Sequence, residues 1–230
     1  MVACCYSAGQ RKEEYLSVAG HYEKEELTKM AKAMAMLVNE MEAHPFRDVL
    51  GPYCTEITAK STVAARGEFH TPQEVAEVMA RLSLNPDEVI EKGKPITVSD
   101  PCCGSGGLVL SLAKLFAPKA EGEPSHVDLI RATLVDVNPI AADMAFINTT
   151  LWGIPAEIIL GNSLQLELRA GWKNLHWARV GEDQRRETEN MVGKMQEVLS
   201  HVEKEQKRQE PDESKPDISF GQDGEQMTFL

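Results

Sequence analysis

A short apolar run that leads into a glycine-rich loop, ITVSDPCCGSGG at residues 96–107, constrains the fold more than any other feature of the chain. The pattern predicts a buried strand that delivers the carboxylate of Asp100 to its carboxyl end, followed by a loop and the first turn of a helix. Glycine lets the backbone of such a loop approach a ligand where a Cβ atom would collide, and the helix offers its N-terminal N–H groups. The alternative is an ordinary tight turn between a strand and a helix.

The spacing within the loop indicates which ligand it suits. One residue separates Gly104 from Gly106, and the acidic Asp100 stands four positions upstream of the first glycine, so the pattern is not the dinucleotide signature G-x-G-x-x-G. It favours S-adenosylmethionine, a cofactor without phosphates, over a dinucleotide or a P-loop nucleotide. The loop therefore predicts a binding site for S-adenosylmethionine.

Two further apolar runs also end in polar residues. The first ends at Asp136 and is followed by Asn138 and Pro139, a helix cap and a first-turn proline. The second ends close to Asn162 and Ser163. Three strand-helix units would thus place polar residues at the same strand ends, where ligands bind in open α/β sheets. We expect an α/β fold with parallel strands, in which Asp136 receives the two ribose hydroxyls of the cofactor.

Three motifs, in the correct order, resemble those of the adenine-N6 DNA methyltransferases, particularly the modification subunits of type I restriction systems. DVLG at 48–51 is similar to their D-L-L-G, GEFHTP at 67–72 to their G-[EQ]-F-[FY]-T-P, and DPCCGSGG at 100–107 to their D-P-x-C-G-[ST]-G-G. The similarity covers roughly residues 45–165 and implies an S-adenosylmethionine-dependent methyltransferase (Rossmann-like) fold. It implies a cofactor site made of Phe69, Thr71, Pro72, Asp100, Pro101, Gly104, Ser105, Gly106, Asp136, Asn162 and Ser163.

A helix is also predicted directly after the second motif. Thr71 to Glu74 form a capping box with proline at the first helical position. The apolar stripe that follows consists of Val75, Val78, Met79 and Leu82. The alternative for Thr71 is that it only caps the helix, and for Phe69 that it belongs to the core. His70 replaces an aromatic residue of the family motif, and we interpret it as a loop residue, because a single histidine without partners is weak evidence for acid-base or metal chemistry.

The chain lacks the N-P-P-[FY] turn with which the resembled family binds the amine of its target adenine. None of the 12 prolines follows another, and Asn138-Pro139-Ile140 is better explained as a helix cap. Asn162 also stands where family members usually carry an aspartate for the adenine amine of the cofactor, although a neutral amide both donates and accepts hydrogen bonds. We therefore expect an incomplete catalytic site and assign no catalytic residue.

The parallel sheet is expected to be truncated, because residues 171–180 offer at most one short strand. Trp172 and Trp177 in this segment are interpreted as packing residues rather than as platforms for a base. Amphipathic helices are predicted at 22–43 and 182–208. Their apolar seams are Leu27, Met30, Met34, Leu37 and Met41, and Met191, Met195, Val198 and Val202. Each helix either lies on its own domain or docks along a helix of a homodimer or of a heteromeric partner.

Length and composition limit the domain organisation. A hydrophobic content of 42% in 230 residues is enough for one core, without a separate target-recognition domain. We expect four regions: an N-terminal helical region at 1–66, a methyltransferase-like cofactor-binding domain at 67–180, an amphipathic helix at 181–210 and a largely disordered tail at 211–230. No apolar run approaches ~18 residues and no signal peptide is apparent, which predicts a cytoplasmic protein. The five cysteines lack zinc spacing, so no metal is expected.

The formal net charge of −12 argues against tight binding to DNA by this chain alone, because Lys and Arg supply most of the non-specific affinity. DNA binding would need a basic partner or a local patch. The candidate patch is Arg47, Lys60, Arg66 and Arg81, for which a solvated face is the commoner explanation.

Three functional hypotheses remain. In the first, the chain binds S-adenosylmethionine but is catalytically incomplete alone and serves as a subunit or regulator in DNA modification, for example in a restriction-modification system. In the second, it is an active methyltransferase with an atypical or partner-supplied acceptor site, since methyl transfer needs mainly in-line positioning. In the third, it is a non-enzymatic assembly protein that kept the fold.

Overall fold

The computed structural model describes residues 1–57, 71–179 and 200. The chain divides into two compact units, Met1–Arg185 and Arg186–Leu230, and the fold below is that of the first. The helix predicted at 182–208, apart from Ser200, and the tail predicted at 211–230 lie outside the described residues. None of the described helices combines the length and the apolar character that crossing a bilayer requires.

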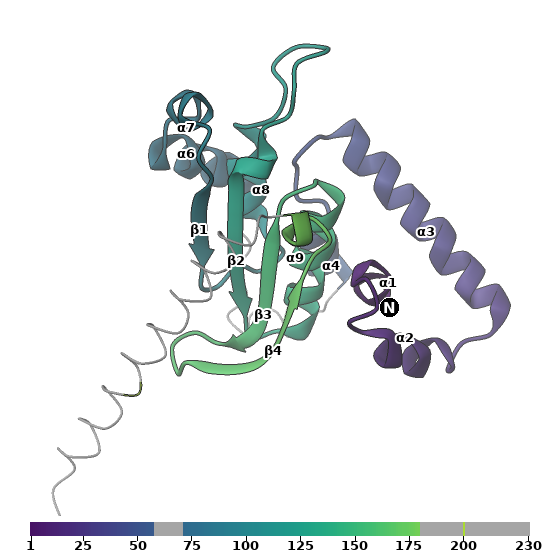
Figure 1. Ribbon diagram of the computed structural model, residues 1–230. Coiled ribbons are helices and arrows are strands. Elements are labelled where there is room, and N and C mark those ends of the chain that lie inside the picture. Colours follow the sequence, from purple (N-terminus) through teal and green to yellow (C-terminus); the bar gives the residue numbers. More distant parts are fainter. Residues whose placement is uncertain (58–70, 180–199, 201–230) are drawn as a thin grey trace, which may run out of the picture. The chain divides into compact units, whose positions relative to one another are not determined.

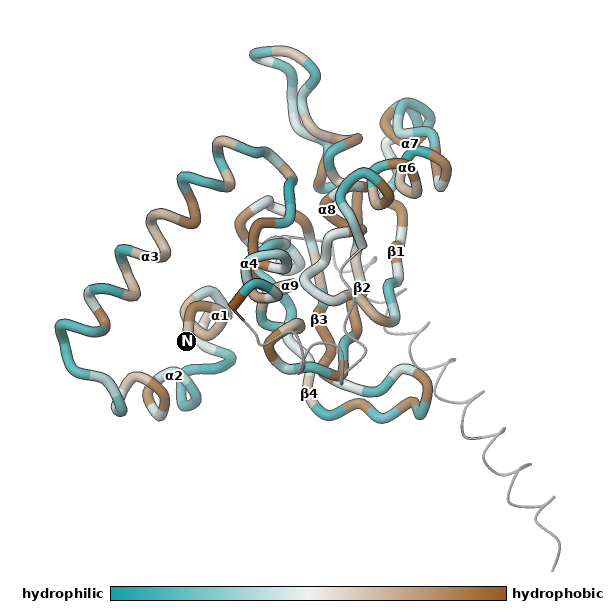
Figure 2. The backbone as a smooth tube through the Cα atoms, turned by 180° about the vertical axis from the view of Figure 1, so that it is seen from behind, coloured by the Kyte–Doolittle hydropathy of each residue, from teal (hydrophilic) through white to brown (hydrophobic). Residues whose placement is uncertain are grey.

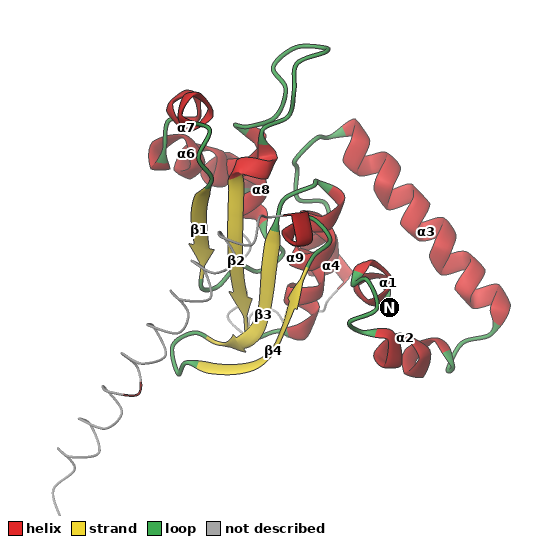
Figure 3. Cartoon of the chain, viewed as in Figure 1, coloured by secondary structure: helices red, strands yellow, loops and turns green. Residues whose placement is uncertain are grey.

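Four strands form one sheet in the order β1-β2-β3-β4 (Figures 1 and 3). The strands are β1 (Ile96–Asp100), β2 (Ile130–Asp136), β3 (Ala156–Asn162) and β4 (Glu167–Lys173). The first three are parallel and β4 is antiparallel to β3. The carboxyl ends of β1, β2 and β3 therefore meet at one edge of the sheet. The predicted α/β fold with a short parallel sheet is confirmed. In the described part of the chain, one further strand follows, which is antiparallel and begins at residue 167.

Two crossover helices cover one face of this sheet. α8 (Gly107–Lys114) connects β1 to β2, and α9 (Pro139–Leu151) connects β2 to β3. Both connections step in the same direction along the sheet, and right-handed crossovers of this kind place both helices on the same face. Alternation along β2 agrees: Ile130, Ala132 and Leu134 are fully buried, whereas the residues between them are only half-buried. Figure 1 shows both helices behind the strands, and Figure 2 gives the view from their side.

α9 lies in the centre of the core. Its cap is as predicted, because the side chain of Asn138 accepts from the N–H of Ile140 at 3.0 Å. Phe146, Asn148 and Thr149 are fully buried, whereas Ile140 in the first turn is 53% exposed. Burial extends around much of the helix because α9 is covered on two sides, by β2 and β3 on one and by α1 on the other.

The chain begins with four helices. These are α1 (Val2–Tyr6), α2 (Lys12–Ala19), α3 (Lys24–Ala43) and α4 (Leu50–Ile57). The helix predicted at 22–43 is confirmed as α3, with a capping box between Glu23 and Glu26. Met41 of its predicted seam is 3% exposed, and the other seam residues are half-buried.

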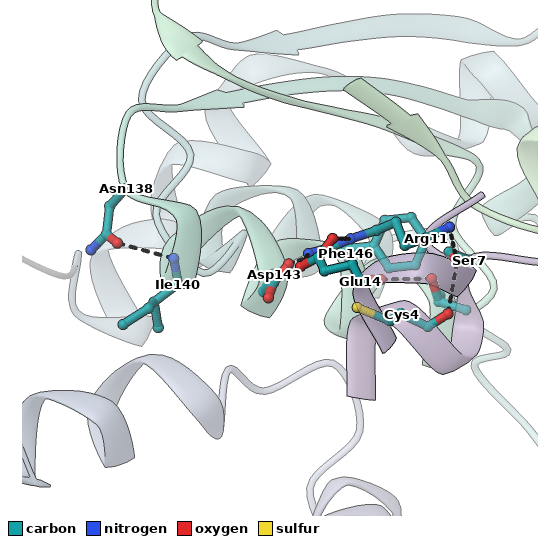
Figure 4. A network of polar contacts seen from close by, with 9 residues as sticks. Cys4, Ser7, Arg11, Glu14, Asn138, Ile140, Asp143 and Phe146 are labelled. Atoms are coloured by element: carbon teal, nitrogen blue, oxygen red, sulfur yellow. Dashed lines mark hydrogen bonds and ion pairs between the residues drawn. The ribbon is translucent and has the colours of Figure 1, made fainter. Parts of the chain in front are cut away.

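Arg11 attaches this N-terminal region to α9 (Figure 4). Its guanidinium group donates to Glu14 and to Asp143 of α9, and it lies 4.3 Å from the centre of the Trp172 ring. Burial by itself would lower the pKa of Arg11, but the hydrogen bonds to the two carboxylates outweigh it and raise that pKa. Trp172 and the 2%-exposed Trp177 are thus packing residues, as interpreted from the sequence.

Two helices precede β1, α6 (Gln73–Ser83) and α7 (Pro86–Lys92). The helix predicted after Thr71 is confirmed, but the predicted capping box is wrong. Pro72 has extended backbone angles and occupies the N-cap position, so the helix begins one residue later, and no side chain of the described residues caps it. The predicted stripe is also not the buried face of α6, because Ala76 and Ala80 pack inward instead.

Candidate functional site

The glycine loop lies against the end of β2. The N–H of Gly104 donates to Oδ2 of Asp136 at 2.8 Å, and the N–H of Cys103 donates to the carbonyl oxygen of Val135 at 2.9 Å. The other carboxylate oxygen of Asp136 accepts from the N–H of Asn138 at 2.8 Å. Each carboxylate oxygen therefore has one backbone donor and keeps a lone pair for a second. The structure brings together the loop and the acidic residue that the sequence placed at one edge of the sheet.

Asp100 presents a second carboxylate at this edge. Its Oδ1 accepts from the N–H of Cys102 at 3.1 Å, whereas its Oδ2 is buried without a hydrogen-bond partner among the described residues. Burial raises the pKa of Asp100, the hydrogen bond from Cys102 opposes this, and the nearby charge of Asp136 raises that pKa further. A buried carboxylate oxygen without a donor is costly, so the site favours a ligand that brings a hydrogen-bond donor or a positive charge.

The loop conformation depends on its glycines. Gly104 and Gly106 have φ angles of +56° and +88°, in the region that other residues rarely adopt. A Cβ atom on Gly106 would also lie 3.6 Å from the Cα atom of Ala145, so the loop packs directly on α9. This close packing places the start of α8 beside the ends of β1 and β2.

Ser105 ties the loop to Asp48 and to Asn148 of α9. Its hydroxyl donates to Oδ2 of Asp48, and Nδ2 of Asn148 donates both to the Ser105 carbonyl oxygen, at 2.8 Å, and to Oδ1 of Asp48, at 3.2 Å. Oδ1 of Asp48 also accepts from the N–H of Gly51 at 3.1 Å, at the start of α4. The Ser105 side chain, predicted as a cofactor contact, is thus engaged with Asp48.

Asp48 and Asn148 were missed as site residues from the sequence. Both had a signal. Asp48 belongs to the DVLG motif, to which no role was assigned, and Asn148 is a polar residue in the middle of an otherwise apolar helix. A buried amide needs hydrogen-bond partners, so its position predicted a polar contact without identifying the partner.

The turn after β3 is built by Asn162. Its Oδ1 accepts from the N–H groups of Leu164 and Gln165 at 3.0 and 3.2 Å, and its Nδ2 donates to Oε1 of Gln165 at 2.8 Å. The side chain that sequence reasoning assigned to the cofactor therefore shapes the β3–β4 turn. Ser163 reaches the glycine loop, because its Oγ lies 3.8 Å from Sγ of Cys102.

The remaining candidate residues are exposed or lie outside the described part of the chain. Pro101 follows β1 and is exposed, and Thr71 and Pro72 are exposed at the start of α6. Phe69 and His70 lie outside the described residues. Of the candidate basic patch, Arg47 and Arg81 are exposed, and the other two residues lie outside the described part of the chain.

Comparison with known proteins gives a family match over most of this region. The model of the family described as N-6 DNA methylase matches residues 47–179, which is more than half of the 230 residues. A crystal structure from Listeria monocytogenes, named as a class I S-adenosylmethionine-dependent methyltransferase, is 22% identical with a TM-score of 0.31. That similarity covers 44% of this chain and 28% of the other, so the chain spans less than a third of the length of that structure. No curated protein matches the chain.

Proposed function

The chain belongs to the N-6 DNA methylase family, and from this premise we propose that it binds S-adenosylmethionine and takes part in DNA adenine-N6 modification. One observation carries the proposal: the glycine loop and Asp136 meet through a hydrogen bond of 2.8 Å beside Oδ2 of Asp100, which has no hydrogen-bond partner among the described residues. Two carboxylates and a glycine-rich loop then lie together at the edge of the sheet.

The donor groups of S-adenosylmethionine fit these acceptors. The cofactor has a cationic amino group and two ribose hydroxyls, and Oδ2 of Asp100 and the free lone pairs of Asp136 would accept from such groups. A nearby cation would also favour the ionised form of Asp100, whose pKa is otherwise raised by burial. When bound, the cofactor supplies a methyl group carried on a sulfonium sulfur. This chain's own residues bind and orient that cofactor.

We further propose that the chain alone is catalytically incomplete and acts as a subunit or regulator. It has no pair of adjacent prolines, so the N-P-P-[FY] turn of the resembled family is missing. Among the described residues, β1 is also an edge strand. In doubly wound sheets, strands continue on both sides of the first strand, and the described residues supply one side. A partner would then provide the groups that hold the target base.

Calorimetric titration with S-adenosylmethionine tests cofactor binding. We expect saturable binding to the full chain, and a loss of at least about tenfold in affinity for Asp136→Ala, equivalent to one lost charge-assisted hydrogen bond. Asp87→Ala, on the exposed surface of α7, is the matched control and should bind as the wild type does. A folded wild-type protein that gives no heat at any concentration would overturn the proposal.

Transfer of a radiolabelled methyl group to adenine-containing DNA tests incompleteness. We expect cofactor binding without transfer by the isolated chain. Transfer by the pure chain would instead support the second hypothesis, an active enzyme with an atypical acceptor site, and would contradict the need for a partner.

A further inference from the structure

α6 buries its small residues and exposes its large apolar ones. Exposed fractions of 47–83% are found for Met79, Val75, Val78 and Leu82. On the opposite side, Ala76 and Ala80 are 1% and 5% exposed. A helix that serves only its own domain turns its larger apolar side chains inward, because their burial gains the most. An apolar face left outside in this way is typical of a contact surface for another molecule.

The orientation of this face is fixed by polar contacts with α8. Nε2 of Gln73 donates to Oγ of Ser111 at 3.3 Å, and Nζ of Lys114 donates to Oε1 of Glu77 at 2.7 Å. Both contacts lie on the alanine side of α6, so they hold the stripe away from α8. Figures 1 and 2 show α6 at the β1 end of the sheet, beside the edge strand.

The charges beside the stripe would match those of a second α6 helix that runs in the opposite direction. Glu74 and Arg81 are seven residues apart, so they lie on one flank of the stripe, near the two ends of α6. Both are exposed. Neither forms a salt bridge among the described residues, although the charge of Arg81 helps to lower the pKa of Glu77 one turn away. In an antiparallel pair of identical helices, equal flanks meet, and Glu74 of each helix faces Arg81 of the other. A parallel pair would not bring these opposite charges together.

From this arrangement we propose that a second copy of the chain covers the stripe, through antiparallel packing of the two α6 helices about a two-fold axis. Such an interface is isologous: the same four apolar side chains are buried from both copies, and two identical ion pairs border them.

The size of the patch sets the expected strength. A single helix face offers less than the roughly 800 Å² per partner of a standard stable interface, so the dimer should be reversible, with dissociation in the micromolar range or weaker. The net charge of −12 per chain opposes association at long range. At physiological ionic strength this repulsion is screened beyond about 8 Å, whereas the apolar contact is unaffected.

Sedimentation equilibrium of the full chain, from about 5 to about 300 µM, tests the proposal over the relevant affinity range. We expect a monomer–dimer equilibrium for the wild type, and Leu82→Glu and Val78→Glu to weaken it at least about tenfold. Both positions are exposed, so both variants should keep the circular dichroism spectrum of the wild type. Met36→Glu, on the 71%-exposed Met36 of α3, is the control and should dimerise as the wild type does.

A charge-reversal cycle tests the antiparallel geometry. Glu74→Arg and Arg81→Glu should each weaken the dimer, because each places like charges opposite one another, and the double variant should restore it. A wild-type chain that stays monomeric over the whole range overturns the proposal. So does a dimer that Leu82→Glu leaves intact, or a double variant no better than the single ones.

Discussion

Asp48→Ala is the substitution whose effect follows most directly from the geometry of the site. The carboxylate accepts from the hydroxyl of Ser105, from Nδ2 of Asn148 and from the N–H of Gly51. Ser105 and Asn148 are 2% and 0% exposed and Gly51 is also buried, so their donors depend on acceptors within the protein. The substitution therefore leaves three buried donors without this acceptor while the loop between β1 and α8 loses its support.

The expected loss follows from the cost of each unsatisfied donor. A buried donor without an acceptor costs about 1–3 kcal/mol, so three give about 3–9 kcal/mol. Nδ2 of Asn148 keeps its bond to the Ser105 carbonyl oxygen through its second hydrogen, which points to the lower half of that range. We expect Asp48→Ala to lower the free energy of unfolding by about 3–6 kcal/mol, a large part of the ~5–15 kcal/mol of a typical domain.

Urea unfolding followed by far-UV circular dichroism measures this loss. Asp87→Ala is the matched control, since its carboxylate pairs with Lys119 on the exposed surface, where solvent screens the pair, and should leave the free energy of unfolding almost unchanged. Asp48→Asn should fall between the two, because the Ser105 hydroxyl can accept a hydrogen bond from an amide as well as donate one. A loss below about 1 kcal/mol for Asp48→Ala, with an unchanged slope against urea, would refute the reasoning.

Three further predictions concern single residues. Burial raises the pKa of Asp100 above its ordinary 3.8, so the folded state binds this proton more tightly than the unfolded state, and stability is lost as the pH rises from about 3.8 through the raised pKa. Asp100→Asn removes that loss. In urea unfolding at pH 7 the variant should be at least as stable as the wild type, and below pH 3.8 the two proteins should be equally stable. Gly106→Ala forces alanine to a φ of +88° and should cost about 1–2 kcal/mol in the same assay. Asp143→Ala leaves the buried guanidinium of Arg11 with one of its two carboxylate partners, Glu14, and should lower the melting temperature, corresponding to about 2 kcal/mol.

The sheet and its polar edge could be predicted from the sequence because their signals are local. Each parallel strand is an apolar run that ends beside a polar residue, and the helix after β2 carries its cap and its first-turn proline in order. Asp100 and Asp136 are therefore placed at the same edge by the alternation of strand and helix alone. The Asn162 turn also follows a local rule, because asparagine side chains commonly bond the backbone two residues on. The family resemblance instead implied a contact between Asn162 and the cofactor.

The support of the glycine loop could not be predicted, because it joins residues that are far apart in the chain. Ser105 and Asp48 are separated by 57 residues, and Asn148 and Asp48 by 100. Their contact depends on how α4 packs against α9, which no local pattern encodes. The orientation of α6 could not be predicted from the sequence either. The spacing of its apolar residues predicts a helix, but which face is buried is decided by the packing of Ala76 and Ala80.

Ligand binding and folding stability make opposing demands on the side chain of Asp100. The fold keeps its Oδ2 buried without a donor among the described residues, and the charge of Asp136 lies close enough to raise its pKa. Because the fold bears the free-energy cost of this unpartnered oxygen before any ligand binds, a ligand that pairs it with a cationic donor recovers that cost in binding free energy. A neutral ligand of similar shape recovers less. Asp100→Asn should therefore be as stable as the wild type and yet lose most of the thermal stabilisation that S-adenosylmethionine gives, since that stabilisation reports binding to the folded state. Equal thermal stabilisation of both proteins by the cofactor would show that Asp100 does not contact it.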